Sequence, residues 1–131
     1  MSIRHTIDRE ACRVQFEVSG TLTSVEMCSA IDKAVSDLAG MHAREVLSDH
    51  RGLDVPATSA QVHVVAAYLD RHADTFAGAH CAMVTASPAS YGMMRMLGAL
   101  VESIPIRVEV FTDINAARAW LEATTHGNQL S

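Results

Sequence analysis

The sequence lacks long hydrophobic runs and basic clusters, and each absence excludes a class of protein. No apolar stretch among its 131 residues approaches the roughly 18 residues that a membrane-spanning helix needs. Ten basic residues stand against fifteen acidic ones, giving a net charge of −5, so binding to nucleic acid or to an anionic membrane is not expected. The first residues lack the apolar segment of a secretory signal peptide. These absences predict a soluble, cytoplasmic protein.

Recognised metal and cofactor motifs are absent as well. The three cysteines, Cys12, Cys28 and Cys81, show no CxxC spacing, and each lies in an apolar pattern that predicts a reduced core thiol. The seven histidines form no HxH, HxxxH or HExxH pair, and neither glycine-rich phosphate-binding motif occurs. We therefore expect no metal, no cofactor and no enzyme of a recognised class.

The chain does contain a regular alternation of strand and helix patterns. The predicted strands cover residues 3–7, 12–18, 44–49, 80–86 and 106–110. The predicted helices follow capping residues Thr23, Thr58, Ser87 and Asp113. The order β-β-α-β-α-β-α-β-α predicts an α/β fold with a mixed, largely parallel sheet wound with helices, because helical crossovers join parallel strands. We expect one domain over residues 1–126 and a C-terminal tail over 127–131.

Polar side chains follow the predicted parallel strands, at the ends where open α/β sheets usually bind ligands. We predict that a set of them shares one ligand-binding or partner-binding rim. The members are Asp49, His50, Arg51, Ser87, Tyr91 and Arg95. A hydrolase using Ser87 and His50 would need oxyanion donors and a G-x-S-x-G elbow, and the elbow is absent. Helix capping by Ser87, or one anion bound at that helix start, are the alternatives.

The third predicted helix is apolar around most of its circumference. One interpretation is a central helix wholly inside the domain, and the other is an outward face that meets a dimer partner or an apolar ligand. The outward face would contain Met93, Met94 and Leu97. Gly92 and Gly98 within this helix indicate close approach by a neighbouring element.

With these elements placed, residues 3–123 resemble the STAS-like, SpoIIAA-like proteins, in particular a small, mostly uncharacterised bacterial branch. The matching stretches are GTLT at 20–23, VLSDHRG at 46–52, AMVTASPASYGMMRM at 82–96 and VEVFTDINAARAWL at 108–121. The resemblance implies a mixed sheet wound with helices, shared with anti-sigma factor antagonists and with lipid-binding CRAL-TRIO domains.

The resemblance also implies a candidate modification site. In the antagonists a serine at the start of the helix after the third strand is phosphorylated, within an Asp-Ser-Ser-Gly stretch. The serine pair falls on Thr58 and Ser59 here, with Ala57 and Ala60 replacing the flanking Asp and Gly. Thr58 and Ser59 are thus candidate phosphoacceptors, and Ser59 joins the candidate partner-binding residues. Plain helix capping by Thr58 and Gln61 is the alternative.

Together these features predict a non-enzymatic regulatory or protein-interaction module that self-associates as a homodimer. The alternative is a domain that binds a small apolar or lipid-like ligand against the third helix, with Tyr91, Arg95 or Arg51 holding its polar head. An enzyme acting through Asp49, His50 and Ser87 is the third hypothesis.

Overall fold

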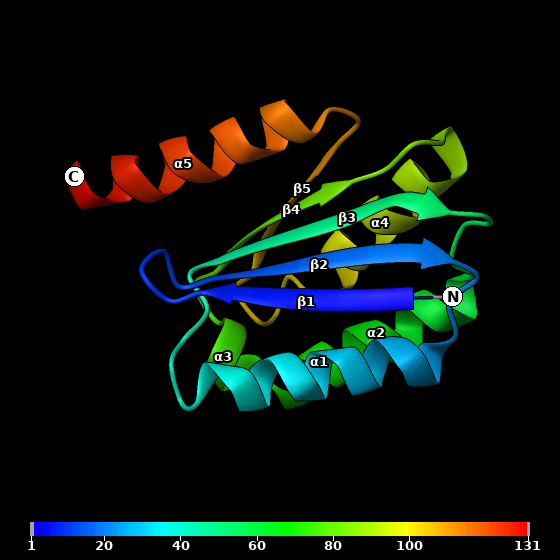
Figure 1. Ribbon diagram of the computed structural model, residues 1–131, viewed down its shortest axis with the longest axis horizontal. Coiled ribbons are helices and arrows are strands. Elements are labelled where there is room, and N and C mark those ends of the chain that lie inside the picture. The colour runs from blue at the N-terminus through cyan, green and yellow to red at the C-terminus, as the bar shows by residue number, and fades with distance from the viewer. Residues whose placement is uncertain (1, 131) are drawn as a thin grey trace.

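The computed structural model describes residues 2–130, and the side chains of residues 3–124. Its strands are β1 (Ser2–Asp8), β2 (Arg13–Gly20), β3 (Glu45–Leu53), β4 (His80–Val84) and β5 (Arg107–Phe111). Its helices are α1 (Ser24–Leu38), α2 (Ser59–Arg71), α3 (Ala73–Phe76), α4 (Pro88–Leu100) and α5 (Ile114–Leu130). Figure 1 shows that these elements form a sheet with helices on both faces.

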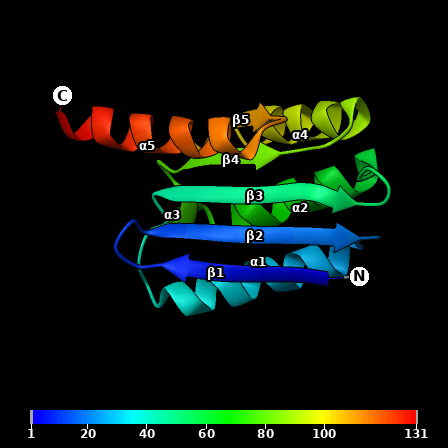
Figure 2. The same cartoon turned by 45° about the horizontal axis from the view of Figure 1, so that its top comes forward.

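The five strands lie in the sheet in the order in which they occur along the chain, as Figure 2 shows. β1 is antiparallel to β2, and all other neighbours are parallel. The predicted α/β class and the mixed, largely parallel sheet are therefore confirmed. From β2 to β5, each crossover connects a strand to its next neighbour on the same side. Because such crossovers are right-handed, their helices all lie on one face of the sheet.

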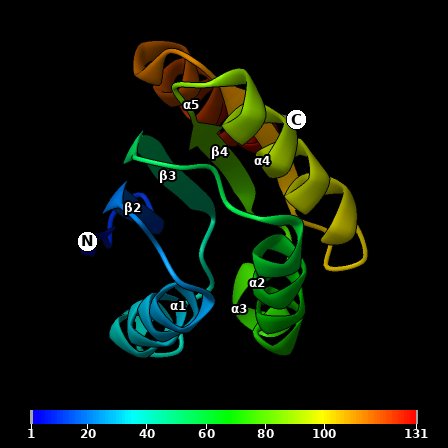
Figure 3. The ribbon, with the colours of Figure 1, turned by 90° about the vertical axis from the view of Figure 1, so that its right-hand side faces the viewer.

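The helices divide the interior into two layers, which Figure 3 shows end-on. α1, α2 and α4 pack on one face and enclose the larger core, which includes Val14, Phe16, Ile31 and Phe76. α5 packs on β3, β4 and β5 from the other face, where Leu47, Ala82, Val84, Ala117 and Leu121 form the smaller core. The central strand β3 is therefore covered on both sides.

β3 is longer than the sequence predicted, because it has a partner strand beyond residue 49. β2 runs alongside it to the end, with Ser19 opposite Gly52 after a shift in register near Glu17. Gly52 permits this approach, since a Cβ atom there would lie 2.9 Å from the Cβ of Ser19 and 3.0 Å from the carbonyl oxygen of Val18. His50 and Arg51 are thus strand residues and not loop residues.

α4 covers the larger core with one face only, and the wholly internal helix of one interpretation is wrong, because Arg95, Ala99 and Leu100 are exposed. Met94 and Leu97 are only 4% and 5% exposed and belong to the larger core, so they cannot form the predicted dimer face. Met93 is half-buried and packs against the same core. Gly98 does allow close approach, since its Cβ would lie 3.2 Å from that of Val108, whereas a Cβ at Gly92 would meet nothing within 4 Å.

Two further boundaries differ from the sequence prediction. The predicted second helix is divided at His72, where the backbone leaves helical geometry, into α2 and the short α3. α5 extends to Leu130, so the described part of the predicted tail at 127–131 is helical.

The capping box at the start of α2 gives a test of this local structure. The amide of Gln61 donates to the Thr58 hydroxyl at 3.1 Å, and the amide of Thr58 donates to the Gln61 side chain at 2.9 Å. We expect Thr58→Ala to lower the free energy of unfolding by about 1 kcal/mol, measured by urea denaturation. Thr58→Ser keeps the hydroxyl and should stay near wild type; equal losses in both variants would contradict the capping role.

Candidate functional site

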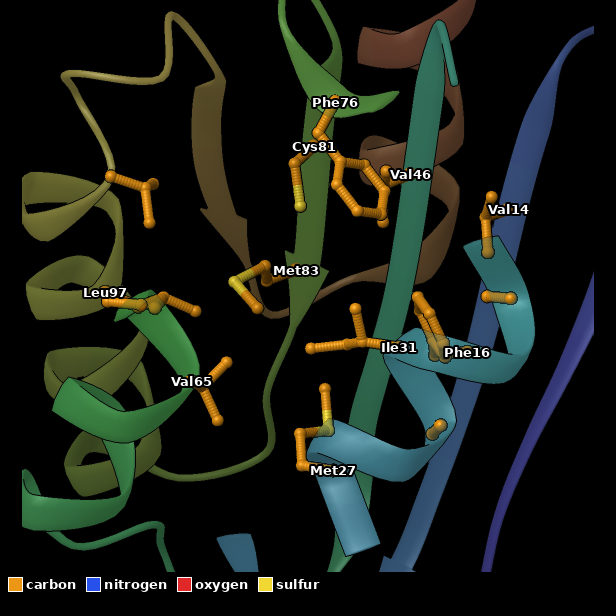
Figure 4. Packing of buried hydrophobic residues seen from close by; sticks show 14 of the residues in the cluster. Val14, Phe16, Met27, Ile31, Val46, Val65, Phe76, Cys81, Met83 and Leu97 are labelled. Carbon is orange, nitrogen blue, oxygen red and sulfur yellow. The ribbon is translucent and has the colours of Figure 1, made fainter. Parts of the chain in front are cut away.

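A cavity of about 250 Å³ lies between the sheet and the helices that cover its larger core. Apolar side chains from α1, α2, α4 and β4 make most of its wall: Met27, Val62, Val65, Met83, Met94 and Leu97. In Figure 4, Met27, Val65, Met83 and Leu97 face one another across the space between sheet and helices. We call this cavity the central pocket.

The mouth of the central pocket is formed by the loops that begin α1 and α2. The side chain of Gln61 links the two loops, because its Nε2 donates to the carbonyl oxygen of Leu22 at 3.1 Å while its Oε1 accepts from Thr58. Val55 lines the mouth and remains 53% exposed. The entrance therefore combines polar caps with exposed apolar surface.

His50 is the only imidazole among the described residues that line the pocket. His50 is only 5% exposed, and its Nε2 hydrogen-bonds with the Ser48 hydroxyl at 2.7 Å. Its Nδ1 is buried and has no hydrogen-bond partner. An unpartnered buried polar atom typically costs about 1–3 kcal/mol, so a molecule that hydrogen-bonds to this nitrogen would remove that cost.

Burial also fixes the charge of His50. Desolvation lowers the pKa of its imidazole from 6.5 to about 4, and the nearby charge of Asp49 opposes part of that shift. The ring is therefore neutral at neutral pH. The described lining contains no Asp, Glu, Lys or Arg, so the central pocket is an uncharged, mostly apolar space.

Strand alternation separates His50 from its two neighbours in sequence. Asp49 and Arg51 point to the face of β3 opposite that of His50. There the Arg51 guanidinium donates to both carboxylate oxygens of Asp49, at 2.9 and 2.8 Å. These hydrogen bonds hold the pKa of Asp49 below its usual value. The predicted acid, base and cation therefore do not act on one substrate.

The remaining predicted site residues lie outside the central pocket. Ser87 caps α4 by accepting from the amide of Ser90 at 3.1 Å. Tyr91 and Arg95 line a separate groove between α4 and β5. Ser59 is exposed beside the mouth, at the first residue of α2. Thr58 lines the mouth, and phosphorylation of either residue remains a prediction.

The sequence alternative placed a ligand against the third predicted helix, and Met94 and Leu97 of that helix do line the central pocket. The place of His50 in the lining was not predicted, although one signal pointed toward it. Val46, Ser48 and His50 share a period-two face, so continuing the strand by one more residue pair would have placed His50 inside the domain. The predicted loop after Asp49 concealed this.

The described part of the chain contains no group of three or more His, Cys, Asp or Glu side chains that could hold a metal ion. None of its helices is long and apolar enough to cross a membrane.

Comparison with known proteins identifies the fold. No family model matches the chain, and neither does any curated protein. A solved structure does match: an uncharacterised protein of the DUF3478 family with a SpoIIAA-like fold from Shewanella loihica PV-4, at a TM-score of 0.67. The chain has a SpoIIAA-like fold. The two sequences are 20% identical, and the match covers 91% of this chain and 93% of the other.

The SpoIIAA-like fold also explains where the central pocket lies. The loops at its mouth follow the carboxyl ends of β2 and β3, which is the edge where open α/β sheets usually bind ligands. At 20% identity the likeness establishes architecture and not activity.

Burial of neutral His50 predicts a dependence of stability on pH. Because the pKa of His50 is about 4 when folded and near 6.5 when unfolded, the unfolded chain binds the extra proton between these values. Stability should be complete above pH 6.5 and fall as the pH drops toward 4, by up to roughly 3 kcal/mol.

Urea denaturation of wild type and His50→Gln over this range measures the effect. Glutamine does not titrate but can still hydrogen-bond with Ser48, so the variant should show a shallower loss. Burial also lowers the pKa of His80, so the variant should still lose some stability as the pH falls, but less than wild type does. Parallel curves for the two proteins would contradict the assignment to His50.

Proposed function

We propose that the protein binds a small, mostly apolar molecule in the central pocket. The observation that supports this proposal is an uncharged cavity with apolar walls that is lined by His50, whose buried Nδ1 has no partner among the described protein atoms. Ligand sites usually combine apolar walls with a few placed polar groups in this way.

The size of the central pocket favours a small ligand. Pockets for drug-sized molecules usually span about 300–1,000 Å³, and this one is slightly smaller, at about 250 Å³. Three methionines, Met27, Met83 and Met94, contribute to its wall. Their flexible thioethers can adjust to the shape of a ligand.

Binding accounts for these residues better than catalysis does. The Ser48–His50 hydrogen bond has the composition of a nucleophile and base. However, Ser48 is 2% exposed in the middle of β3, which pairs with strands on both sides. Backbone amides in such a ladder are not free to stabilise an oxyanion. We therefore propose a binding domain and not an enzyme.

A regulatory or protein-interaction role, in the cytoplasm and as a homodimer, remains the sequence prediction. The SpoIIAA-like fold supports it by analogy alone. Ligand binding is compatible with such a role, because a bound molecule stabilises the conformation that holds it.

Methionine methyl NMR provides the direct test of ligand binding. Butylbenzene, a small apolar probe, should shift the methyl resonances of Met27, Met83 and Met94 in a saturable way, because these side chains line the central pocket. Met41 and Met96 do not line it and should remain unchanged. Uniform shifts of all five resonances, or no shifts, would contradict the proposal.

A variant that fills the entrance should prevent binding. Ala57 is half-buried and lines the pocket, so Ala57→Trp should abolish the butylbenzene shifts. Ala60→Trp, on the exposed surface of α2, is the matched control and should bind as wild type does. Equal binding by both variants would place the probe elsewhere.

A further inference from the structure

We infer that the ligand of the central pocket carries a single uncharged hydroxyl group and hydrogen-bonds through it to Nδ1 of His50. This inference rests on the proposed function and adds the chemical class and the orientation of the ligand. Its hydroxyl would lie at His50, and its apolar part would lie among the methionine and aliphatic side chains.

The Ser48 hydrogen bond leaves one ring nitrogen for a ligand. Nε2 of His50 is 2.7 Å from the Ser48 hydroxyl, which restrains the orientation of the imidazole within the strand face. Nδ1 then has no partner among the described protein atoms, although it is buried. A ligand group that reaches Nδ1 would remove the cost of an unsatisfied polar atom.

A hydroxyl is the head group that suits both forms of the neutral ring. If Nε2 carries the proton, Nδ1 is an acceptor, and if Nδ1 carries it, Nδ1 is a donor. The Ser48 hydroxyl can complement either tautomer, so the protein does not impose one. A ligand hydroxyl likewise donates or accepts, whereas an ether or a ketone can only accept.

The surroundings disfavour a charged head group. No charged side chain lines the described wall of the pocket, and the Asp49–Arg51 pair lies on the other face of the sheet. A buried carboxylate or ammonium would therefore have no counter-ion, and an unpaired buried charge is strongly unfavourable. An alcohol or a phenol has a far smaller desolvation cost.

Four probes of similar shape test the inference. Butylbenzene, phenylpropanol and phenylpropylamine share a ring and a short chain and end in a methyl, a hydroxyl and an ammonium group. Dissociation constants come from the Met27, Met83 and Met94 methyl resonances, and phenylpropanoate adds a carboxylate. We expect saturable binding of the methyl and hydroxyl probes and weak or no binding of the two charged probes.

The role of His50 is measured as a ratio, because the probes differ in their affinity for water. The dissociation constant of butylbenzene divided by that of phenylpropanol should be about tenfold larger in wild type than in His50→Phe, since one hydrogen bond is lost. The double variant Ser48→Ala/His50→Phe removes the unpartnered serine if the single variant is unstable. In wild type, phenylpropanol and not butylbenzene should shift the ¹⁵N resonance of Nδ1.

The outcomes separate the inference from the proposed function. An unchanged ratio, an Nδ1 resonance that ignores phenylpropanol, or tighter binding of a charged probe would overturn the hydroxyl assignment while leaving a binding pocket. If no probe shifts Met27, Met83 or Met94, the proposed function itself fails, and the inference fails with it.

Discussion

The position of β3 at the centre of the sheet is the constraint on which the rest of the structure depends. Because β3 is paired on both edges and covered on both faces, successive side chains enter two different layers. Leu47 packs beneath α5, whereas Ser48 and His50 face the layer of α1, α2 and α4. The same alternation leaves Asp49 and Arg51 to form an ion pair away from the pocket.

The pocket follows from how three helices cover one face of the sheet. Parallel strands joined by crossovers bring the starts of α1, α2 and α4 to the same edge, and Thr23, Thr58 and Ser87 cap them there. Gly98 lets α4 approach β5 closely at Val108. The space at the other side of α4 is lined by flexible and branched apolar side chains, and a single imidazole supplies its buried polar group.

Most of the fold was predictable from the sequence because its signals are local. Period-two patterns located the strands, and the Thr23 and Thr58 boxes located two helix starts to the residue. The candidate site was less predictable, because it depends on non-local pairing. Only the partner strand at Ser19 shows that β3 continues through His50, and only the packed core shows that Met94 and Leu97 are internal.

The side chain of Gln61 makes two kinds of hydrogen bond, and together they limit which residues position 61 can accept. A capping box works with either Glu or Gln at its third helical position, and α1 uses Glu26 there. At Gln61 the side chain has a second task, because its amide group also donates to Leu22 at the start of the other helix. Glutamate at position 61 would preserve the capping hydrogen bonds, and its helix propensity is similar to that of glutamine. It has no side-chain N–H to donate to Leu22, so Gln61→Glu would remove the hydrogen bond that links the two loops. Position 61 thus accepts fewer side chains than the capping box alone would allow.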